Sequence, residues 1–526
     1  MKRQLHHLIT HTADALPANI AVKHKQRSVD YHTLAAHITE AAAGYQQLGL
    51  ERSERVAIYL PKLIETVVAS FATSYADGVM VSVNPILKPE QVKYILNDCN
   101  ARILVTSSQK AAQLKEVLAQ CHDLHTLIIV DDKTLNFAPP PHFTTMGWNT
   151  FTRLSSNTPH NQNIDSDMAA ILYTSGSTGK PKGVVLSHRN LIAGAESVAS
   201  YLNNRQSDKI LALLPFSFDY GFSQLTSAFI SGAQVHLLDY LLPREVLNLI
   251  AQEQITGLAA VPTLWSQLVE LNWHPQIKQC LRYITNSGGA MPATTLQELR
   301  NQLPETELYL MYGLTEAFRS TYLPPDQLDL KPGSIGKAIP NAEVMVLRED
   351  GSLCAAGEPG ELVHRGALVA LGYWNNPEKT AKRFKPVPSH HGGCMPAEIA
   401  VWSGDKVYRD EEGYHYFIGR EDEMIKTSGY RVSPTEVEEV LYESGLVKQG
   451  VAFGVPHPVM GQAILAVVTL REGEEGKLLQ RYCKQFLPTF MQPQIIIKKG
   501  PLPHNPNGKI DRAGIFRGYQ DYYLTE

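Results

Sequence analysis

A run of glycine, serine, threonine and lysine between two apolar segments is the part of this sequence best suited to chemistry. It lies in YTSGSTGKPKGVVLSH, from Tyr173 to His188, and follows the strand-like AAILY. Backbone N–H groups and small hydroxyls in such a loop approach a polyphosphate closely, and lysine offsets its charge. Lys180 is followed by Pro181 instead of serine or threonine, which excludes a Walker A motif. We therefore predict a phosphate-binding loop in preference to a mobile linker.

Three further motifs carry charged side chains that a nucleotide site could use. MYGLTE ends an expected strand and offers Glu316, a carboxylate able to bind a hard cation beside phosphate oxygens. WSGDKVY offers Asp405, and a carboxylate can accept bidentate hydrogen bonds from two neighbouring hydroxyls. PLPHNPNGKIDR offers Lys509 near the end of the chain. Taken singly, a glutamate such as Glu316 is more often a neighbour of a helix cap, and a lysine such as Lys509 is more often solvated. Asp405 has the alternative of a turn aspartate.

The motifs occur in one order along nearly the whole chain, and together they resemble those of the AMP-forming adenylating enzymes. That family includes acyl-CoA ligases, amino-acid adenylation domains and firefly luciferase, and its phosphate loop matches Tyr173–Gly183 throughout. The resemblance extends to NSGGAMP, Asn286–Pro292, whose glycines let the backbone lie against adenine. It implies that ATP or AMP contacts Thr174, Ser175, Gly176, Ser177, Thr178, Gly179, Lys182, Gly288, Gly289, Ala290, Tyr312, Gly313, Asp405 and Arg420.

The resemblance also implies a role for individual residues, with ATP and Mg²⁺ as the expected cofactors. Tyr312 would stack on adenine, Thr315 would hydrogen-bond the phosphate of the adenylate, and Glu316 would ligate Mg²⁺. Asp405 would hold both ribose hydroxyls, and Arg420 would contact the ribose and help to fix the nucleotide. These residues lie far apart in the sequence, so the fold must bring them together.

Two half-reactions are implied by the same resemblance. In the first, Lys509 would bridge the attacking carboxylate and the α-phosphate and so offset the charge of the pentacoordinate state. The small domain would then rotate about Asp422, withdraw Lys509 and present KTSGYRVSP, Lys426–Pro434. A pantetheine thiol, belonging to CoA or to an acyl or peptidyl carrier protein, would displace AMP to form a thioester.

The segment LPFSFDYGFSQL, Leu214–Leu225, bears on which acid is activated. Phe218-Asp219 follows the pattern of the amino-acid adenylating members, in which the aspartate binds the α-ammonium. An ammonium that enters an apolar pocket needs a carboxylate partner. If Asp219 instead caps the following helix, the enzyme is an acyl- or aryl-CoA ligase for an acid without an amine. Candidates for the rest of the acid pocket are Tyr220, Ser223, Tyr309 and Met311.

Two subgroups of the family resemble this chain further. MYGLTEAFRSTYLPP and MIKTSGYRVSPTEVEEVLY look like the AMP-forming acyl-CoA ligases encoded beside bacterial exosortase systems, and FDYG looks like stand-alone prolyl-AMP ligases. We therefore expect a free-standing ligase for a small amino acid, proline-like acids included. A luciferase-like oxidoreductase would share the adenylate, but nothing in the sequence specifically supports it. A non-catalytic AMP-binding relative would be expected to lack Lys509 or Glu316, and both are present.

The elements that must position these residues are predicted from hydrophobic periodicity. Strand-like and helix-like segments alternate in the first third, which predicts a mostly parallel sheet with helical crossovers. From Asn341, short alternating runs broken by glycine and proline predict antiparallel strands. We expect an α/β fold with a large N-terminal domain over 1–421, β-rich at about 341–421. A small, mobile α+β domain would occupy 423–526, with the hinge at Asp422.

Some local expectations can be compared directly with a structure. Helices are predicted at Gln109–Gln120, Ala293–Gln302, Pro434–Ser444 and Lys477–Phe486. The stretch KPVPSHHGGCMPAE, Lys385–Glu398, is predicted to be a surface loop because of its proline and glycine content.

Composition sets the broad class of the protein. The 526 residues are 44% hydrophobic and 19% charged, which is typical of a soluble protein with more than one domain. Its 48 basic and 52 acidic side chains give a net charge of −4, without a basic field for nucleic acid. The six cysteines are scattered singly, which excludes a disulfide framework and fits a reducing compartment. No signal peptide or membrane-spanning apolar run is visible, so we expect a cytoplasmic protein.

Overall fold

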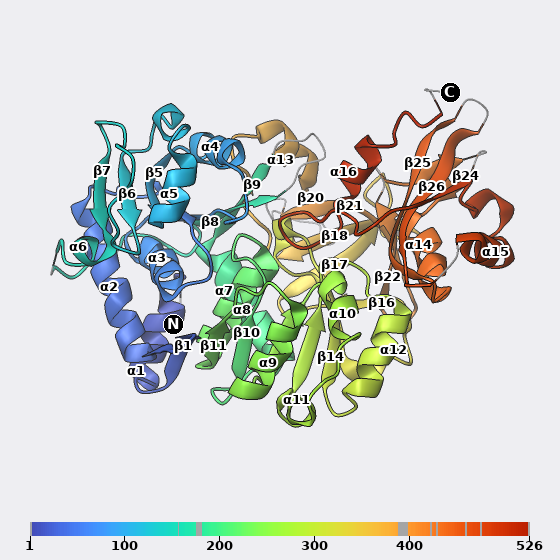
Figure 1. Cartoon of the computed structure of the whole chain (residues 1–526), viewed down its shortest axis with the longest axis horizontal. Coiled ribbons are helices and arrows are strands. Elements are labelled where there is room, and N and C mark those ends of the chain that lie inside the picture. Colours follow the sequence, from blue (N-terminus) through green and yellow to red (C-terminus); the bar gives the residue numbers. More distant parts are fainter. Residues whose placement is uncertain are drawn as a thin grey trace, which may run out of the picture.

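The computed structural model of the protein has a large N-terminal domain and a smaller C-terminal domain at one edge (Figure 1). It describes residues 3–155, 157–174, 181–387, 398–420, 423–427, 430–457, 460–473 and 476–523. The predicted hinge residue Asp422 and most of the predicted phosphate loop, Ser175 to Gly179, lie outside these described residues.

A mostly parallel sheet organises the first third of the chain, as the alternating pattern predicts. Within this sheet only β9 pairs in the antiparallel sense, with β8 and β19. From edge to edge its strands are β19 (Gly372–Tyr373), β9 (Lys182–Ser187), β8 (Met168–Thr174), β4 (Val79–Ser82), β3 (Arg55–Tyr59), β5 (Ala101–Thr106), β6 (Thr126–Ile129) and β7 (Thr144–Gly147).

The second sheet has 14 strands and combines both predicted patterns. A parallel block from β14 to β1 continues through β15 and β16 into the antiparallel strands of the β-rich region. In order, the strands are β17 (Ala342–Leu347), β18 (Gly360–Gly366), β21 (Ile399–Arg409), β22 (His415–Arg420), β16 (Ser334–Ala338), β15 (Thr321–Leu323), β14 (Glu307–Tyr312), β13 (Tyr283–Asn286), β12 (Gly257–Ala260), β10 (Lys209–Ala212), β11 (Gln234–Leu237), β1 (Ile20–His24) and β2 (Arg27–Asp30), with β20 (Phe384–Pro386) beside β21.

Helices cover these two sheets and close the large domain. Local signals fix several of their ends: Ser187 caps one helix by accepting from the Asn190 N–H, and Gly232, at φ +70°, ends another. The helices are α1 (His7–Ala15), α2 (Tyr31–Gln47), α3 (Ile64–Tyr75), α4 (Pro89–Asp98), α5 (Ser108–Leu114), α6 (Trp148–Phe151), α7 (His188–Tyr201), α8 (Asp219–Ser231), α9 (Pro243–Glu253), α10 (Pro262–Leu268), α11 (Pro275–Cys280), α12 (Ala293–Gln302) and α13 (Pro377–Arg383), with 3₁₀ turns η1 (Leu118–Gln120), η2 (Thr315–Ala317) and η3 (Pro325–Gln327).

The C-terminal domain is a five-stranded sheet between two layers of helix. Along β26, Ile464, Ala466 and Val468 belong to one apolar cluster and Leu465 and Val467 to another, as the two-residue period of a strand requires. The elements are β24 (Tyr430–Val432), β23 (Ile425–Thr427), β26 (Gly461–Leu470), β25 (Val447–His457), β27 (Ile495–Lys498), α14 (Pro434–Glu443), α15 (Gly476–Phe486), η4 (Thr489–Met491) and α16 (Arg512–Arg517).

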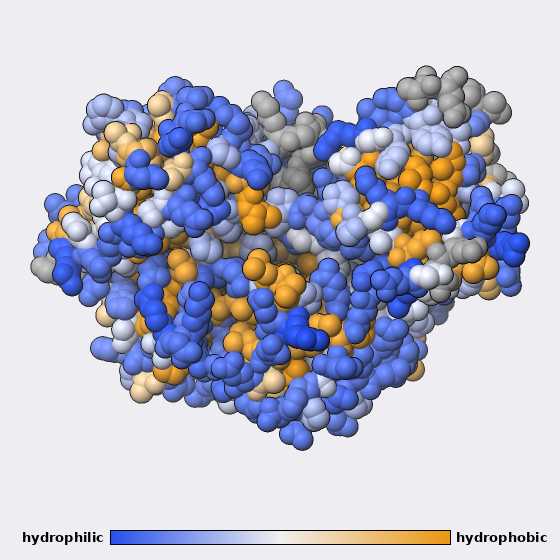
Figure 2. Space-filling view, viewed as in Figure 1, coloured by the Kyte–Doolittle hydropathy of each residue, from blue (hydrophilic) through white to orange (hydrophobic). Residues whose placement is uncertain are grey.

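Figure 2 shows a largely hydrophilic face, with apolar side chains gathered over β25 and β26. Within the described ranges, none of the helices has both the length and the apolar character needed to cross a membrane.

Two local predictions need correction. The helix expected over Gln109–Gln120 is interrupted, because α5 ends at Leu114 and only a 3₁₀ turn, η1, follows. The loop expected over Lys385–Glu398 begins as strand β20, which pairs with β21 through Pro386. Proline is tolerated there because β20 pairs on one side only. Residues 388–397 of that loop lie outside the described part of the chain.

Candidate active site

The loop that carries Lys509 reaches from the C-terminal domain onto the large domain. Asn84 donates a side-chain hydrogen bond to the Pro506 carbonyl at 2.9 Å, and Thr263 donates one to the Gly508 carbonyl at 2.6 Å. Neither donor was predicted from the sequence, because an isolated asparagine or threonine after a strand carries no motif. These two bonds hold the backbone of the lysine loop against the large domain.

The Lys509 side chain lies in a narrow space between β13 and the start of α8. Its Nζ is 5.0 Å from the centre of the Phe218 ring, within the range of a cation–π contact. Gly288 has a φ of +86°, and a Cβ at that position would lie 2.7 Å from Lys509 Cε. Glycine at 288 is therefore needed both for the backbone conformation and for the approach of the lysine.

Burial lowers the pKa of Lys509, and the positive charges of Arg420 and Arg319 lower it further. The carboxylate of Asp219 acts in the opposite direction and favours the ammonium form. A cation desolvated in this way interacts strongly with any anion that enters the site. The catalytic role of Lys509 stays a prediction, and its burial and nearby charges are compatible with it.

Lys182, Glu316 and Tyr373 form a second polar cluster at the ends of β9 and β14. Lys182 Nζ lies 2.8 Å from Glu316 Oε1 and 2.9 Å from the Tyr373 hydroxyl, which itself donates to Glu316 at 2.5 Å. Burial would raise the pKa of Glu316, but the Lys182 ammonium and these hydrogen bonds hold it below its ordinary value. A buried carboxylate kept ionised fits the ligand set of Mg²⁺, which also needs phosphate oxygens and water.

A third cluster joins Tyr312 at the end of β14, Asp405 on β21 and Arg420 at the end of β22. The Tyr312 hydroxyl donates to Asp405, and Arg420 Nε lies 3.2 Å from Asp405 Oδ1. Asp405 Oδ1 is buried and accepts no hydrogen bond from the described residues. The carboxylate thus keeps an acceptor for a hydroxyl donor, and this fits the predicted contact with ribose.

A fourth cluster surrounds Asp219, the first residue of α8. Its Oδ1 accepts the Tyr220 N–H at 2.9 Å, and its Oδ2 lies 3.3 Å from Nη1 of Arg319. The guanidinium of Arg319 is stacked 4.7 Å from the Tyr220 ring. Burial raises the pKa of Asp219, and the cations Arg319 and Lys509 oppose that rise. Asp219 therefore does not cap α8, whose N-cap is Phe218, and instead forms a buried ion pair.

The other acid-pocket candidates lie along the same apolar cluster. Tyr309 and Met311 are buried and lie on one face of β14, and the hydroxyl of Tyr201 on α7 is 3.0 Å from Met311 Sδ. Tyr220 is buried with its hydroxyl 2.5 Å from Thr285. The side-chain oxygen of Ser223 is buried and has no partner among the described residues.

The remaining predicted nucleotide contacts are placed as follows. Thr174 ends β8, and Thr315 lies in η2 beside Glu316. Gly289 follows β13 and accepts a hydrogen bond from Asn286 at 3.1 Å. Also near the clusters are Ala290, directly after Gly289, and Gly313, directly after β14.

Arg319 and Tyr373 are functional candidates that sequence reasoning missed. The sequence offered a weak indication of each residue. Arg319 lies six residues after the end of an expected strand, and Tyr373 lies in LGYWN; both stand out among small or apolar neighbours. Nothing in their spacing, however, indicates that Arg319 reaches Asp219 or that Tyr373 reaches Glu316.

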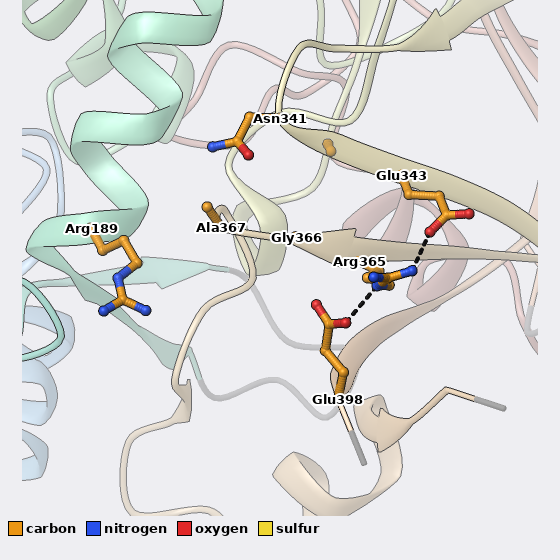
Figure 3. A pocket seen from close by; sticks show the side chains of 8 residues that line it. Arg189, Asn341, Glu343, Arg365, Gly366, Ala367 and Glu398 are labelled. Carbon is orange, nitrogen blue, oxygen red and sulfur yellow. Dashed lines mark hydrogen bonds and ion pairs between the residues drawn. The ribbon is translucent and has the colours of Figure 1, made fainter. Parts of the chain in front are cut away.

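A separate surface hollow lies beside the first turn of α7 and the paired strands β17 and β18 (Figure 3). Arg365 at its centre pairs with Glu343 and Glu398, each at 2.6 Å. None of its lining residues belongs to the four clusters, so it is not the site of the predicted reaction. They are Arg189, Asn341, Ala342, Glu343, Arg365, Gly366, Ala367 and Glu398.

Comparison with known families and proteins agrees with this geometry. The AMP-binding enzyme family matches residues 9–374, and the AMP-binding enzyme C-terminal domain matches residues 436–509. The long-chain-fatty-acid–CoA ligase of Bacillus subtilis (strain 168) is 27% identical over 97% of this chain and 93% of its own. Gramicidin S synthase 2 of Aneurinibacillus migulanus is 28% identical over 95% of this chain, which spans only 11% of that protein.

Solved structures of related enzymes share the fold along almost the whole chain. The anthranilate CoA ligase AuaEII with anthranoyl-AMP has a TM-score of 0.87 at 22% identity, covering 99% of this chain and 98% of that one. ATP-bound MatB from Rhodopseudomonas palustris has a TM-score of 0.85 at 25% identity, covering 99% and 100%. O-succinylbenzoate CoA synthetase (MenE) from Bacillus subtilis, with ATP and magnesium, has a TM-score of 0.80 at 25% identity, covering 96% and 98%.

The family matches cover both domains, and the structure assembles the lysine loop, the Glu316 cluster and the Asp405 cluster around one site. The chain therefore belongs to the AMP-binding enzymes and is an AMP-forming acid–thiol ligase.

Proposed function

We propose that this ligase activates a small acid that carries an α-amine and transfers it to a pantetheine thiol, of CoA or of a carrier protein. The observation that supports the amine is the position of Asp219 directly after Phe218, whose ring centre lies 5.0 Å from Lys509 Nζ. In an α-amino acid the ammonium and the reacting carboxylate are attached to neighbouring carbons. A carboxylate within electrostatic reach of Lys509 is therefore what such a zwitterion needs.

In the first half-reaction, an oxygen of the acid's carboxylate bonds to the α-phosphorus of ATP, and the bond from that phosphorus to the bridging oxygen breaks. Pyrophosphate leaves with the electron pair. Lys509 would contact the attacking oxygen and the α-phosphate and oppose the charge that develops there. Asp405 and Tyr312 would hold the nucleoside, while Lys182 would face the phosphates. Mg²⁺ bound at Glu316 would supply charge compensation for the phosphate oxygens.

In the second half-reaction, the thiol sulfur bonds to the acyl carbon and gives up its proton, and AMP leaves with the oxygen that joined it to the acyl group. We propose that the C-terminal domain first rotates about Asp422, which removes Lys509 from the site. The CoA ligases among the relatives support CoA as the acceptor, and a carrier protein is the alternative source of the same thiol.

An acid without an amine is the second candidate, and the pair between Asp219 and Arg319 favours it. A buried carboxylate that already has a cation does not need an ammonium from the substrate. Each oxygen of Asp219 can nevertheless accept a second hydrogen bond, because each accepts only one from the described residues. The two candidates therefore differ in whether Asp219 touches the substrate.

Pyrophosphate release from MgATP tests the proposal with two matched panels, the proteinogenic amino acids and the same acids without the amine. We expect turnover with an amino acid, and a loss of kcat/KM of at least about 30-fold in Asp219→Asn. Turnover with the deaminated acids that is unaffected by Asp219→Asn would instead identify the amine-free class. Supplying CoA or a pantetheine-loaded carrier protein then identifies the acceptor.

A further inference from the structure

Arg319 carries hydrogen-bonding capacity that the protein itself does not use. Its side chain is 2% exposed, and Nη1 makes both of its hydrogen bonds to described residues, to Asp219 and to the Phe318 carbonyl. Nε and Nη2 are buried and have no hydrogen-bond partner among the described residues. A buried N–H without an acceptor is costly, so this unpaired donor edge requires an explanation.

The unused edge is the one that binds carboxylates elsewhere in this chain. Arg189 donates from Nε and Nη2 to the two oxygens of Asp165, both at 3.0 Å. Arg282 binds Asp208 in the same way at 3.2 and 2.7 Å. The parallel N–H bonds of this edge match the spacing of two carboxylate oxygens, which makes the pairing bidentate.

The guanidinium of Arg319 is fixed in position before any ligand binds. The Tyr220 ring lies 4.7 Å from its central carbon, the Phe318 ring lies 5.5 Å away, and Asp219 holds Nη1. A donor pair held by three contacts loses little entropy when it binds an acceptor. The side-chain oxygens of Ser223 and Asn286 are also buried without partners in the described part of the chain.

Charge balance points to the same ligand. Arg319 and Lys509 are the cations that act on Asp219, with Glu316 a more weakly acting carboxylate, and Asp405 also acts on Lys509. The reacting carboxylate of the substrate would offset Lys509, but an α-ammonium would add a positive charge beside Asp219. A second carboxylate on the substrate, placed at Arg319, removes that excess.

We propose that the acid is an amino acid with a second carboxylate, which binds bidentately to Nε and Nη2 of Arg319. The inference rests on the proposed function, because it concerns the acid that this same site would activate. Asp219 would then lie between the α-ammonium and the second carboxylate of the substrate. One oxygen of Asp219 would bind the ammonium, and the other would keep its contact with Arg319. Substrates that lack the second carboxylate would leave the buried donor edge empty and would be rejected.

The test compares aspartate and glutamate with asparagine, glutamine and the amine-free succinate and glutarate, again by pyrophosphate release. We expect kcat/KM for one of the two acidic amino acids to exceed that of its amide by at least about 10-fold. Arg319→Lys keeps a cation beside Asp219 but removes the bidentate edge, and it should reduce that preference by roughly 10- to 100-fold. The KM for ATP should not change. Arg189→Lys, on the surface, is the matched control and should leave every value unchanged.

A calorimetric titration of the wild-type protein with glutamate and with glutamine tests the carboxylate site at Arg319 separately from the proposed function. Binding of the acidic amino acid that is lost in Arg319→Lys, without pyrophosphate release, would support the site but contradict the proposed function. Release with succinate or glutarate equal to the amino acids would support the second carboxylate and contradict the amine. Equal turnover of amides, apolar amino acids and acidic amino acids would overturn the inference.

Discussion

Removal of either partner of the ion pair between Asp219 and Arg319 should strongly destabilise the protein, and two single substitutions measure this. The two charges are 3.3 Å apart, with side chains 4% and 2% exposed. At an effective dielectric constant of ~20 they attract each other by about 5 kcal/mol, most of which offsets desolvation. Removal of one partner leaves the other buried and unpaired, at a cost of about 3–5 kcal/mol. We therefore expect Asp219→Asn and Arg319→Met to lower the unfolding temperature markedly.

The double variant should be less destabilised than the sum of the two single variants, because no charge is then left alone. The exposed pair of Arg189 and Asp165 provides the control, since its side chains are 55% and 39% exposed. Breaking that pair should cost only about 0–1 kcal/mol. Differential scanning calorimetry of the whole chain, with the large-domain transition followed, gives the comparison. Additive losses at Asp219 and Arg319 would refute the claim that the two charges depend on each other.

The two single variants should also differ in their response to pH. Burial raises the pKa of Asp219 above its unfolded value of about 4, so the folded protein binds this proton more tightly than the unfolded chain. Stability therefore falls as pH rises from about 4 through the folded pKa. The positive charges of Arg319 and Lys509 lower the pKa of Asp219, and Glu316 raises it. Arg319→Met should therefore raise this pKa, extend the pH range over which stability falls, and lose most stability at neutral pH. In Asp219→Asn the unpaired guanidinium of Arg319 stays charged at every pH. The loss of stability in this variant should therefore not follow the titration of Asp219.

Four further substitutions test the site. Lys509→Ala should lower adenylation by roughly 10²- to 10³-fold while a supplied acyl-adenylate still reacts with the thiol; equal loss of both half-reactions would contradict the assignment. Gly288→Ala should impair adenylation alone, because its Cβ would meet Lys509 Cε at 2.7 Å. Glu316→Gln should raise the Mg²⁺ concentration needed for half-maximal pyrophosphate release, and an unchanged requirement would exclude it as a ligand. Asp405→Asn should raise the KM for ATP more than that for the acid, as measured with each substrate in turn.

The large features of the fold could be read from the sequence because each has a local cause. Alternating strand and helix patterns predicted the parallel blocks, and the helix at Ala293–Gln302 has the predicted ends. The interruption of the helix after Leu114 could not be read, because apolar periodicity continues through the 3₁₀ turn. Likewise, the pattern after Asn341 predicted antiparallel strands but did not indicate that they extend the same sheet as the parallel block.

The site was predictable where a motif names the residue, and not where two distant side chains meet. Glu316 and Lys182 are both in motifs, but their contact at 2.8 Å depends on how β9 and η2 approach each other. Arg319 lies close to a motif, yet its pairing with Asp219, 100 residues earlier, is a property of tertiary structure alone. This matters because Asp219 considered alone suggests an ammonium site, whereas the pair adds a carboxylate-binding edge.

The contacts of the lysine loop are weak enough to allow the departure from the site that we propose between the half-reactions. Its backbone is fixed by two neutral hydrogen bonds, from Asn84 and Thr263, each worth about 1 kcal/mol. An exposed ion pair, Lys448 with Glu270, joins the domains nearby and adds at most about 1 kcal/mol. Burial of the Lys509 ammonium opposes these contacts until an anion enters. The bound acid and ATP should therefore hold the loop in place, and conversion to the adenylate with loss of pyrophosphate should release it.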